Sequence, residues 1–189
     1  MNGLREKRAK IGHHDGPQSM INKYGIDVFL GQARFVDQNT LSVNGKEIKF
    51  AKCVIASGGR PRVPKIPGLE KIEYFTSENI FEISQLPKNL VIVGGGPIGS
   101  ELGQAFSRMG SNVKMLVRSG TFLPKEDYDV GPLMKSVFEE EGIEFVSNFT
   151  FTEIRPQTSE IQTEKGQLPT HEIVLKVGDT ERTLQCDAL

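Results

Sequence analysis

The 189-residue sequence lacks tryptophan, has only two cysteines and three histidines, and carries almost no net charge. A formal charge of −1 gives no electrostatic reason to expect binding to nucleic acid or to a membrane surface. No apolar run approaches the roughly 18 residues that a membrane-spanning helix needs. The charged first ten residues contain no apolar core of a secretory signal. These absences favour a soluble globular protein, and we expect a cytoplasmic location.

The cysteines and histidines form no recognisable reactive centre. Cys53 and Cys186 lie too far apart to form a Cys-x-x-Cys pair, and a reducing compartment is the default expectation. Residues 13–15 (His-His-Asp) are interpreted as an exposed loop, and His171 stands alone between turns. We therefore predict no metal site and no catalytic residue within this chain.

The most informative stretch is LVIVGGGPIGSE, residues 90–101, in which an apolar strand pattern passes directly into a helical one. Its glycines have the spacing Gly-x-Gly-x-x-Gly, which permits a tight turn, close approach of phosphates and close helix–strand packing. Backbone N–H groups at such a helix start bind a pyrophosphate. The alternative is a purely structural turn. The residues expected at this dinucleotide site are Gly94, Gly95, Gly96, Pro97, Ile98 and Gly99.

The end of the following strand distinguishes NADP from NAD. An acidic residue about 20 positions on would bind the ribose of NAD, but the sequence has Val117 and Arg118 there. A guanidinium can bind a 2′-phosphate, so we expect NADP, with NAD less favoured. The alternative is that Arg118 is a solvated loop residue. Glu101 is expected in the first helical turn, either as a partner of the helix dipole or near the nicotinamide.

Residues 89–189 alternate between strand and helix patterns, which predicts a parallel βαβαβ unit followed by antiparallel strands. Pro97 suits the first turn of the first helix, and Gly110 and Gly142 suit the two helix ends. The expected parallel strands are 90–93, 113–117 and 143–146, and the expected antiparallel pieces are 149–154, 172–177 and 181–186.

Residues 1–88 have a different pattern. We expect a helix over 1–24, broken near residues 12–16, and a hairpin at Asn44-Gly45, where both central residues need positive φ. Residues 60–70 predict an extended connector. A short helix with Ser77 as its N-cap is expected to end before Pro87. The expected strands are 26–30, 33–36, 40–43, 46–50 and 53–56.

Several segments occur in a fixed order: CVIASGGRP (53–61), IPGL (66–69), TSENIF (76–81) and VIVGGGPIGSEL (91–102). This succession resembles the FAD-dependent pyridine nucleotide–disulfide oxidoreductases, with mercuric reductase-like and dihydrolipoamide dehydrogenase-like members nearest. The resemblance implies an α/β fold: a Rossmann-like βαβαβ NAD(P)-binding domain with an antiparallel meander, preceded by the C-terminal part of an FAD-binding domain. The expected boundaries are 1–70 for the partial FAD domain, 71–88 for a connector helix, and 89–189 for an NAD(P) domain lacking its last strand.

The resemblance also implies roles for individual residues. Ala33 would meet the FAD adenine through its backbone, and Ala56, Ser57 and Gly58 would lie beside the FAD, with serine in place of the usual threonine. The glycines of 94–99 would hold the NADPH pyrophosphate, Glu101 would approach the nicotinamide, and Arg118 would bind the 2′-phosphate. Pro97 replaces a tyrosine that gates the site in some members.

The sequence also departs from the family pattern. The N-terminal FAD glycine motif, the redox-active Cys-x4-Cys pair and the dimerisation domain with its catalytic His and Glu are missing. We therefore expect a middle section of an enzyme that passes hydride from NADPH to FAD and then reduces a disulfide or Hg(II). The parent enzyme would be a homodimer, and this chain alone would be inactive. The alternative is a non-catalytic nucleotide-binding protein that is complete from Met1 to Leu189.

Overall fold

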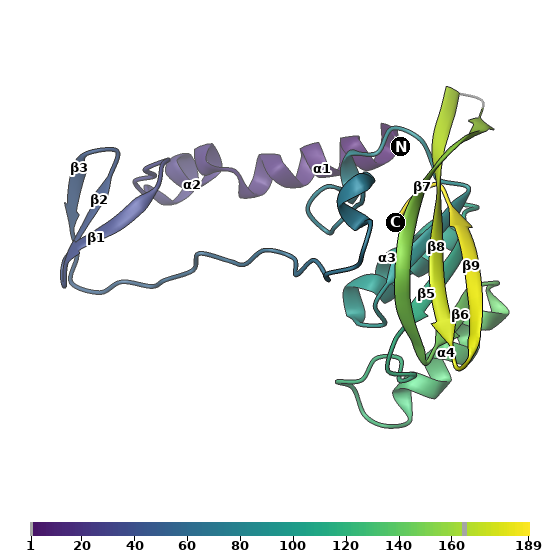
Figure 1. Cartoon of the computed structure of the whole chain (residues 1–189). Helices are drawn as coiled ribbons and strands as arrows, with labels where there is room; N and C mark the ends of the chain where they lie inside the picture. The colour runs from purple at the N-terminus through teal and green to yellow at the C-terminus, as the bar shows by residue number, and fades with distance from the viewer. Residues whose placement is uncertain (1, 164–165) are drawn as a thin grey trace. The chain divides into compact units, whose positions relative to one another are not determined.

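The computed structural model describes residues 2–163 and 166–189 and divides into two compact units, coloured purple to blue and teal to yellow in Figure 1. The N-terminal unit is Asn2–Arg60 and the C-terminal unit is Pro61–Leu189. The expected first domain extends to residue 70, but residues 61–70 belong to the C-terminal unit. The reason is that Ile66 and Leu69 are buried in the core of that unit.

The C-terminal unit contains a parallel sheet and two helices (Figure 1). Each strand neighbour in the order β4-β5-β6 is parallel, and the predicted alternation of strands and helices is confirmed. Pro97 begins the first helix, and Gly110 follows it with a φ of 105°. The elements are β4 (Asn89–Val93), α3 (Pro97–Arg108), β5 (Asn112–Val117), α4 (Val130–Glu140) and β6 (Glu144–Ser147).

The parallel sheet separates two hydrophobic cores, which explains why its strands are apolar on both faces. Neighbouring residues of one strand, such as Leu90 and Val91, belong to different cores because successive side chains point to opposite faces. The core shared with the helices includes Leu90, Val113, Met115, Val117, Phe106 and Phe138. The core shared with the antiparallel sheet includes Val91, Leu116, Val146, Ile154, Ile173, Leu175 and Leu184.

The antiparallel sheet consists of β7 (Phe149–Thr163), β8 (Gly166–Val177) and β9 (Thr180–Cys186). After β9 the chain returns to the edge of β4 opposite β5. The carboxylate of Asp187 accepts the backbone N–H groups of Lys88 (2.8 Å) and Asn89 (2.6 Å). The carbonyl of Ala188 accepts the N–H of Val91 at 3.0 Å. The first residues beyond β9 therefore already lie beside β4 in a parallel direction.

The expected connector helix over 71–88 is wrong. Residues 69–88 contain only two short 3-10 helices, η1 (Leu69–Lys71) and η2 (Ile80–Glu82). Side chains close a tight turn before η2: the N–H of Thr76 donates to Asn79 Oδ1 at 2.6 Å, and the N–H of Glu78 donates to Thr76 Oγ1 at 3.2 Å. Thr76 therefore makes the contact that was expected of Ser77. Such local bonds compete with helix formation.

The N-terminal unit has two helices and a three-stranded antiparallel sheet. The predicted Asn-Gly hairpin is confirmed, with φ of 51° at Asn44 and 80° at Gly45. Residues 13–15 continue the first helix and do not form a loop, while the side chains of His14 and Asp15 lie outside the described residues. The elements are α1 (Asn2–Asp15), α2 (Pro17–Tyr24), β1 (Ala33–Asp37), β2 (Thr40–Val43) and β3 (Lys46–Lys49).

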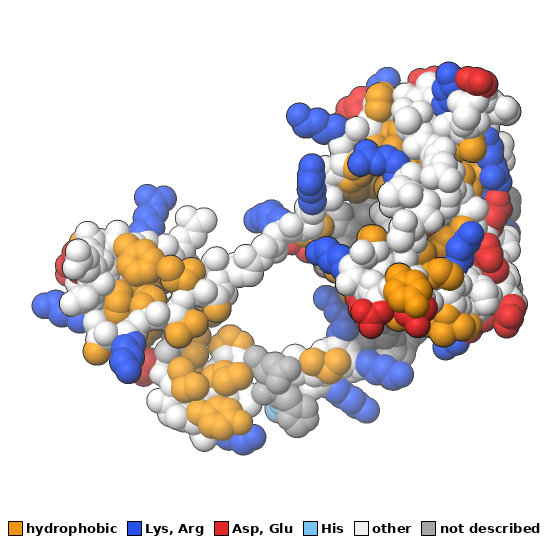
Figure 2. Space-filling view, turned by 90° about the horizontal axis from the view of Figure 1, so that it is seen from below, with side chains coloured by type: hydrophobic (Ala, Val, Ile, Leu, Met, Phe, Trp, Pro, Cys, Tyr) orange, Lys and Arg blue, Asp and Glu red, His pale blue; other side chains and the backbone are white. Residues whose placement is uncertain are grey.

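Two expected strands, 26–30 and 53–56, are not strands in the structure. Val54 and Ile55 are 89% and 73% exposed. A strand needs a hydrogen-bonded neighbour, and the described part of this unit pairs only β1 with β2 and β2 with β3. Figure 2 shows hydrophobic side chains spread over the surface of this unit, in the left part of the view.

Candidate dinucleotide-binding site

The glycine loop, residues 94–99, joins β4 to α3 at the carboxyl end of the parallel strands. Gly94 extends the sheet by donating its N–H to the carbonyl of Leu116 at 2.9 Å, and its φ of 120° then turns the chain. On its two edges β4 is flanked by β5 and by Ala188, which comes from the far end of the chain. Ligands of open α/β sheets bind where neighbouring strands come from such different parts of the chain.

The glycines of this loop have different surroundings. A Cβ at Gly99 would lie 2.8 Å from the Gly94 carbonyl oxygen, and one at Gly95 would lie 2.9 Å from Cγ2 of Val117. By contrast, Gly96 has a φ of −90°, which any residue adopts, and nothing lies within 4 Å of its Cβ position. The packing of the protein therefore requires glycine at 95 and 99 but leaves open space at Gly96.

Several backbone amides of the glycine loop and of the helix start are unpartnered in the described part of the chain. The N–H groups of Gly95, Gly96, Ile98 and Gly99 have no hydrogen-bond partner among residues 2–163 and 166–189. The first turn of α3 contains no acidic residue. Free amides at the positive end of a helix dipole can bind an anion without any charged side chain.

The two charged residues predicted for this site are both exposed. Arg118 directly follows β5 and has no ion pair with any described residue. Arg108, in contrast, donates to the Glu141 carboxylate at 3.0 Å (Nε–Oε2), which lowers the pKa of that carboxyl. Glu101 is the fifth residue of α3, so it begins the second turn and not the first turn, where it was expected. Its side chain is exposed near the open end of the helix.

The loop after Arg118 is tied to the glycine loop by contacts that the sequence did not reveal. The N–H of Leu123 donates to the carbonyl of Gly95 at 2.7 Å, with a φ of 50° that is uncommon for leucine. Phe122 anchors the loop in the core, its ring 5.5 Å from that of Phe138 and 5.0 Å from that of Phe145. The left-handed backbone conformation of this leucine depends on tertiary contacts, so no local sequence pattern predicts it.

The residues predicted to meet FAD lie in the N-terminal unit. Ala33 is exposed in β1, opposite Val43. Ala56, Ser57 and Gly58 are exposed in an extended segment outside any strand, where Gly58 has a φ of 68°. Within the described part of the chain, no hydrogen bond joins Ala33 to this segment.

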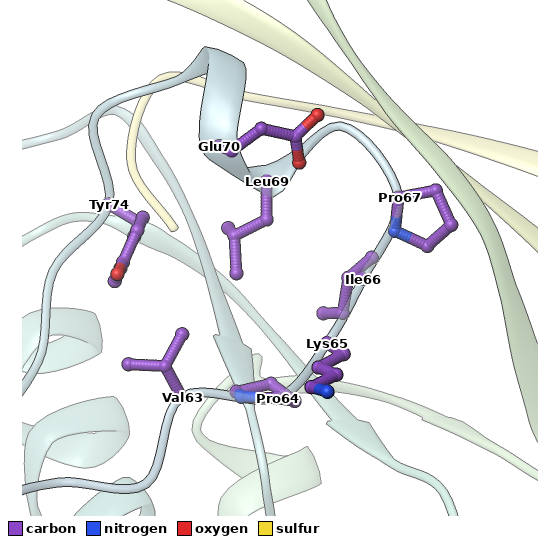
Figure 3. Close-up of a pocket in the computed structure, with 8 residues that line it drawn as sticks. All are labelled: Val63, Pro64, Lys65, Ile66, Pro67, Leu69, Glu70 and Tyr74. Atoms are coloured by element: carbon purple, nitrogen blue, oxygen red, sulfur yellow. The ribbon is translucent and has the colours of Figure 1, made fainter.

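The connector before β4 encloses a hollow of about 470 Å³ that does not include the glycine loop (Figure 3). Val63 and Leu69 point toward one another across it, with Tyr74 on one side. Its walls are mainly apolar, and the remaining lining residues are Pro64, Lys65, Ile66, Pro67 and Glu70. The main-chain amides that could bind a pyrophosphate belong to the glycine loop, which does not line this hollow.

The remaining candidate groups are structural. Burial raises the pKa of the Cys186 thiol to about 12, and the nearby Asp187 carboxylate adds to that rise. A protonated, buried thiol is a poor nucleophile.

No group of three or more His, Cys, Asp or Glu side chains could hold a metal ion in the described ranges 2–163 and 166–189. Over the same residues, no helix combines the length and apolarity that crossing a bilayer requires.

The family model of the pyridine nucleotide-disulphide oxidoreductases matches residues 5–188, which is almost the whole chain and includes both units. The chain belongs to this family. It is 37% identical over 143 residues to the mercuric reductase of Lysinibacillus sphaericus, and 35% identical over 136 residues to that of Bacillus cereus. These matches cover 76% and 72% of the chain. The predicted family resemblance is thus confirmed.

Solved structures agree on the fold. The HOCl-induced flavoprotein disulfide reductase RclA from Escherichia coli matches the whole chain with a TM-score of 0.76 and 26% identity. The mixed α/β fold, with parallel and antiparallel sheets, is therefore that of a flavoprotein disulfide reductase. The chain spans 26% and 22% of the two mercuric reductases and 41% of the RclA chain.

Proposed function

We propose that the C-terminal unit binds NADPH as a Rossmann-like nucleotide-binding domain, within an oxidoreductase that passes hydride from NADPH to FAD. The observation that carries this proposal is the open space at Gly96. Nothing in the protein requires glycine there, yet unpartnered amides surround the position. A diphosphate that approaches the backbone accounts for both the missing side chain and the free N–H groups.

The choice of NADPH rests on Arg118. Its guanidinium directly follows β5 and has no ion-pair partner in the described part of the chain. Val117, which precedes it, is buried and carries no charge that would repel a 2′-phosphate. A planar guanidinium binds phosphate through two parallel hydrogen bonds, whereas the neutral ribose of NAD gives it little to bind. Glu101 is proposed to lie on the nicotinamide side.

The N-terminal unit is proposed to contact FAD through Ala33 and residues 56–58. Its exposed apolar side chains and the unpaired extended segment at 53–60 support an incomplete flavin-binding surface. When bound, NADPH supplies the hydride and FAD passes the electron pair to a disulfide or to Hg(II). The names of the relatives support these two acceptors, and this chain contributes the positioning of NADPH.

The experiment is calorimetric titration of the full chain with NADPH and NADH, comparing the wild type with Gly96→Ala. A Cβ at Gly96 would occupy the space of the phosphates and block hydrogen bonds to a charged group. Such bonds are worth about 1.5–3 kcal/mol. We expect NADPH binding to weaken about 10- to 100-fold. The Gly96→Ala protein should stay folded, because the added methyl group meets nothing.

Gly12→Ala is the matched control, since Gly12 also has open surroundings but lies in α1. It should leave NADPH affinity unchanged. In parallel, Arg118→Ala should weaken NADPH about tenfold and NADH hardly at all. Wild-type protein that is folded and binds neither coenzyme would overturn the proposed function.

A further inference from the structure

The peptide that joins Gly96 to Pro97 can be held at one atom only. Proline has no N–H, so the carbonyl of Gly96 is the only hydrogen-bonding group in that peptide plane. Gly96 itself is the residue type with the greatest backbone freedom, and no neighbour restricts it sterically. The direction of this peptide, and of the helix start behind it, therefore depends on what binds the Gly96 oxygen.

Both donors to that oxygen come from Ser100. Its backbone N–H donates to the Gly96 carbonyl at 3.0 Å, and its side-chain Oγ–H donates to the same atom at 2.9 Å. Ser100 is only 7% exposed, and its hydroxyl points back to the loop carbonyl. The hydroxyl is thus committed to positioning the loop and is not free to contact a ligand.

A second hydrogen bond fixes the preceding peptide, which joins Gly95 to Gly96. The carbonyl of Gly95 accepts the N–H of Leu123 at 2.7 Å. Because C=O and N–H point in opposite directions across a trans peptide, this bond turns the Gly96 N–H away from Leu123. The two ties fix the two peptide planes on either side of Gly96.

From this geometry we propose that Ser100 is a positioning residue for the pyrophosphate: its hydroxyl fixes the Gly96–Pro97 peptide so that the amides of Gly96 and Ile98 face one anion. This inference rests on the proposed function. It adds a residue that the glycine spacing does not include. Without the hydroxyl, one donor remains on the Gly96 oxygen, and the loop samples directions in which its amides no longer converge.

The test compares Ser100→Ala with Ser107→Ala in the full chain. Ser107 lies on the same helix and also donates its hydroxyl to a backbone carbonyl, that of Glu141 at 3.3 Å, but away from the glycine loop. Calorimetry with NADPH should show a loss of about three- to tenfold for Ser100→Ala, as expected for one neutral hydrogen bond. Ser107→Ala should stay within about twofold of wild type, and Ser100→Thr, which keeps the hydroxyl, should restore binding.

Two readouts separate positioning from a general loss of stability. Adenosine 2′-phosphate has no pyrophosphate, so its affinity should be the same in wild type and Ser100→Ala. The amide resonances of Gly96 and Ile98 in ligand-free protein should shift in Ser100→Ala and stay in place in Ser107→Ala. If Ser100→Ala does not fold, Ser100→Cys, which has similar size and a weak donor, takes its place in both measurements.

The inference is overturned if wild type binds NADPH and the two alanine variants bind it equally well. It is also overturned if Ser100→Ala weakens NADPH and adenosine 2′-phosphate by the same factor. Absence of NADPH binding by the wild type is a different result, because that outcome removes the proposed function itself.

Discussion

The two units have similar proportions of apolar residues but bury them very differently. In the described part of the N-terminal unit, Val43 is the only buried hydrophobic residue, whereas the C-terminal unit builds two extended cores. Of the sixteen exposed large hydrophobic side chains among the residues with described burial, ten belong to Asn2–Arg60. Apolar patterning therefore makes a core only where a second surface is present to receive it. The two mercuric reductases are about three times as long as this chain, which matches 26% and 22% of their length.

The sharpest test of this difference compares one phenylalanine from each unit. Phe138 is 2% exposed and packs against the rings of Phe122 and Phe145, while Phe35 is 54% exposed. We expect Phe138→Ala to lower the free energy of unfolding by about 3–5 kcal/mol. Phe35→Ala should change it by less than about 0.5 kcal/mol. Urea unfolding followed by circular dichroism measures both, and equal losses would show that the N-terminal unit has a core of its own.

A pair of left-handed glycines sharpens the comparison. Gly68 has a φ of 87°, and a Cβ there would lie 2.0 Å from the carbonyl oxygen of Ile154. Gly25 has a φ of 63° and open surroundings. Gly68→Ala combines backbone strain with overpacking and should cost about 2–5 kcal/mol. Gly25→Ala carries only the strain, about 1–2 kcal/mol. Differential scanning calorimetry that found the two variants equally destabilised would contradict the packing described at Gly68.

The smallest expected effect is a pH dependence confined to the C-terminal unit. His171 is 6% exposed, its Nδ1 has no partner, and burial lowers its pKa below the usual 6.5, although Asp187 and Glu73 oppose that shift. The unfolded chain therefore binds the proton more readily than the folded one. Stability is complete above pH 6.5 and falls as the pH drops below it toward the lower folded-state value, by at most about 1.4 kcal/mol per pH unit.

Urea midpoints of wild type and His171→Asn between about pH 8 and 5.5 measure this slope. The wild-type midpoint should fall on the acid side, and the substitution should flatten that fall. An identical slope in both proteins would assign the acid sensitivity to other groups. Glu144 is not such a group in this range: despite its partial burial, its bonds with Lys114 and Arg182 lower its pKa, so it titrates at more acidic pH.

Local sequence was sufficient for the elements that carry their own signals. Strands β4, β5 and β6 begin and end within one residue of the predicted bounds, since each is a short apolar run beside a helix with a Pro or Gly at its end. The segments 26–30 and 53–56 have equally apolar sequences but no strand structure, because pairing depends on a neighbour that local sequence cannot supply.

The site was predicted only in part for the same reason. Spacing alone predicted the glycine turn and the helix start, because these are local features, while the roles of the glycines and of Arg118 in binding a nucleotide stay predictions. Glu101 begins the second turn of α3 and not the first, and neither Ser100 nor Leu123 was singled out. The bond of Leu123 depends on how a distant loop returns to the glycine loop, which no residue spacing encodes. The bond of Ser100 to the carbonyl four residues earlier is a local one that serine often makes in a helix, and its spacing was overlooked.

The carboxylate of Asp187 has one more consequence. By accepting the main-chain N–H groups of Lys88 and Asn89, it binds the residue after β9 to the first residue of β4. The antiparallel strands therefore leave the parallel sheet after β6 and return to it at β4, so both ends of this segment are fixed to the same sheet. Substitutions on the exposed positions of β7–β9 should consequently leave the position of β4, and of the glycine loop that follows it, unchanged.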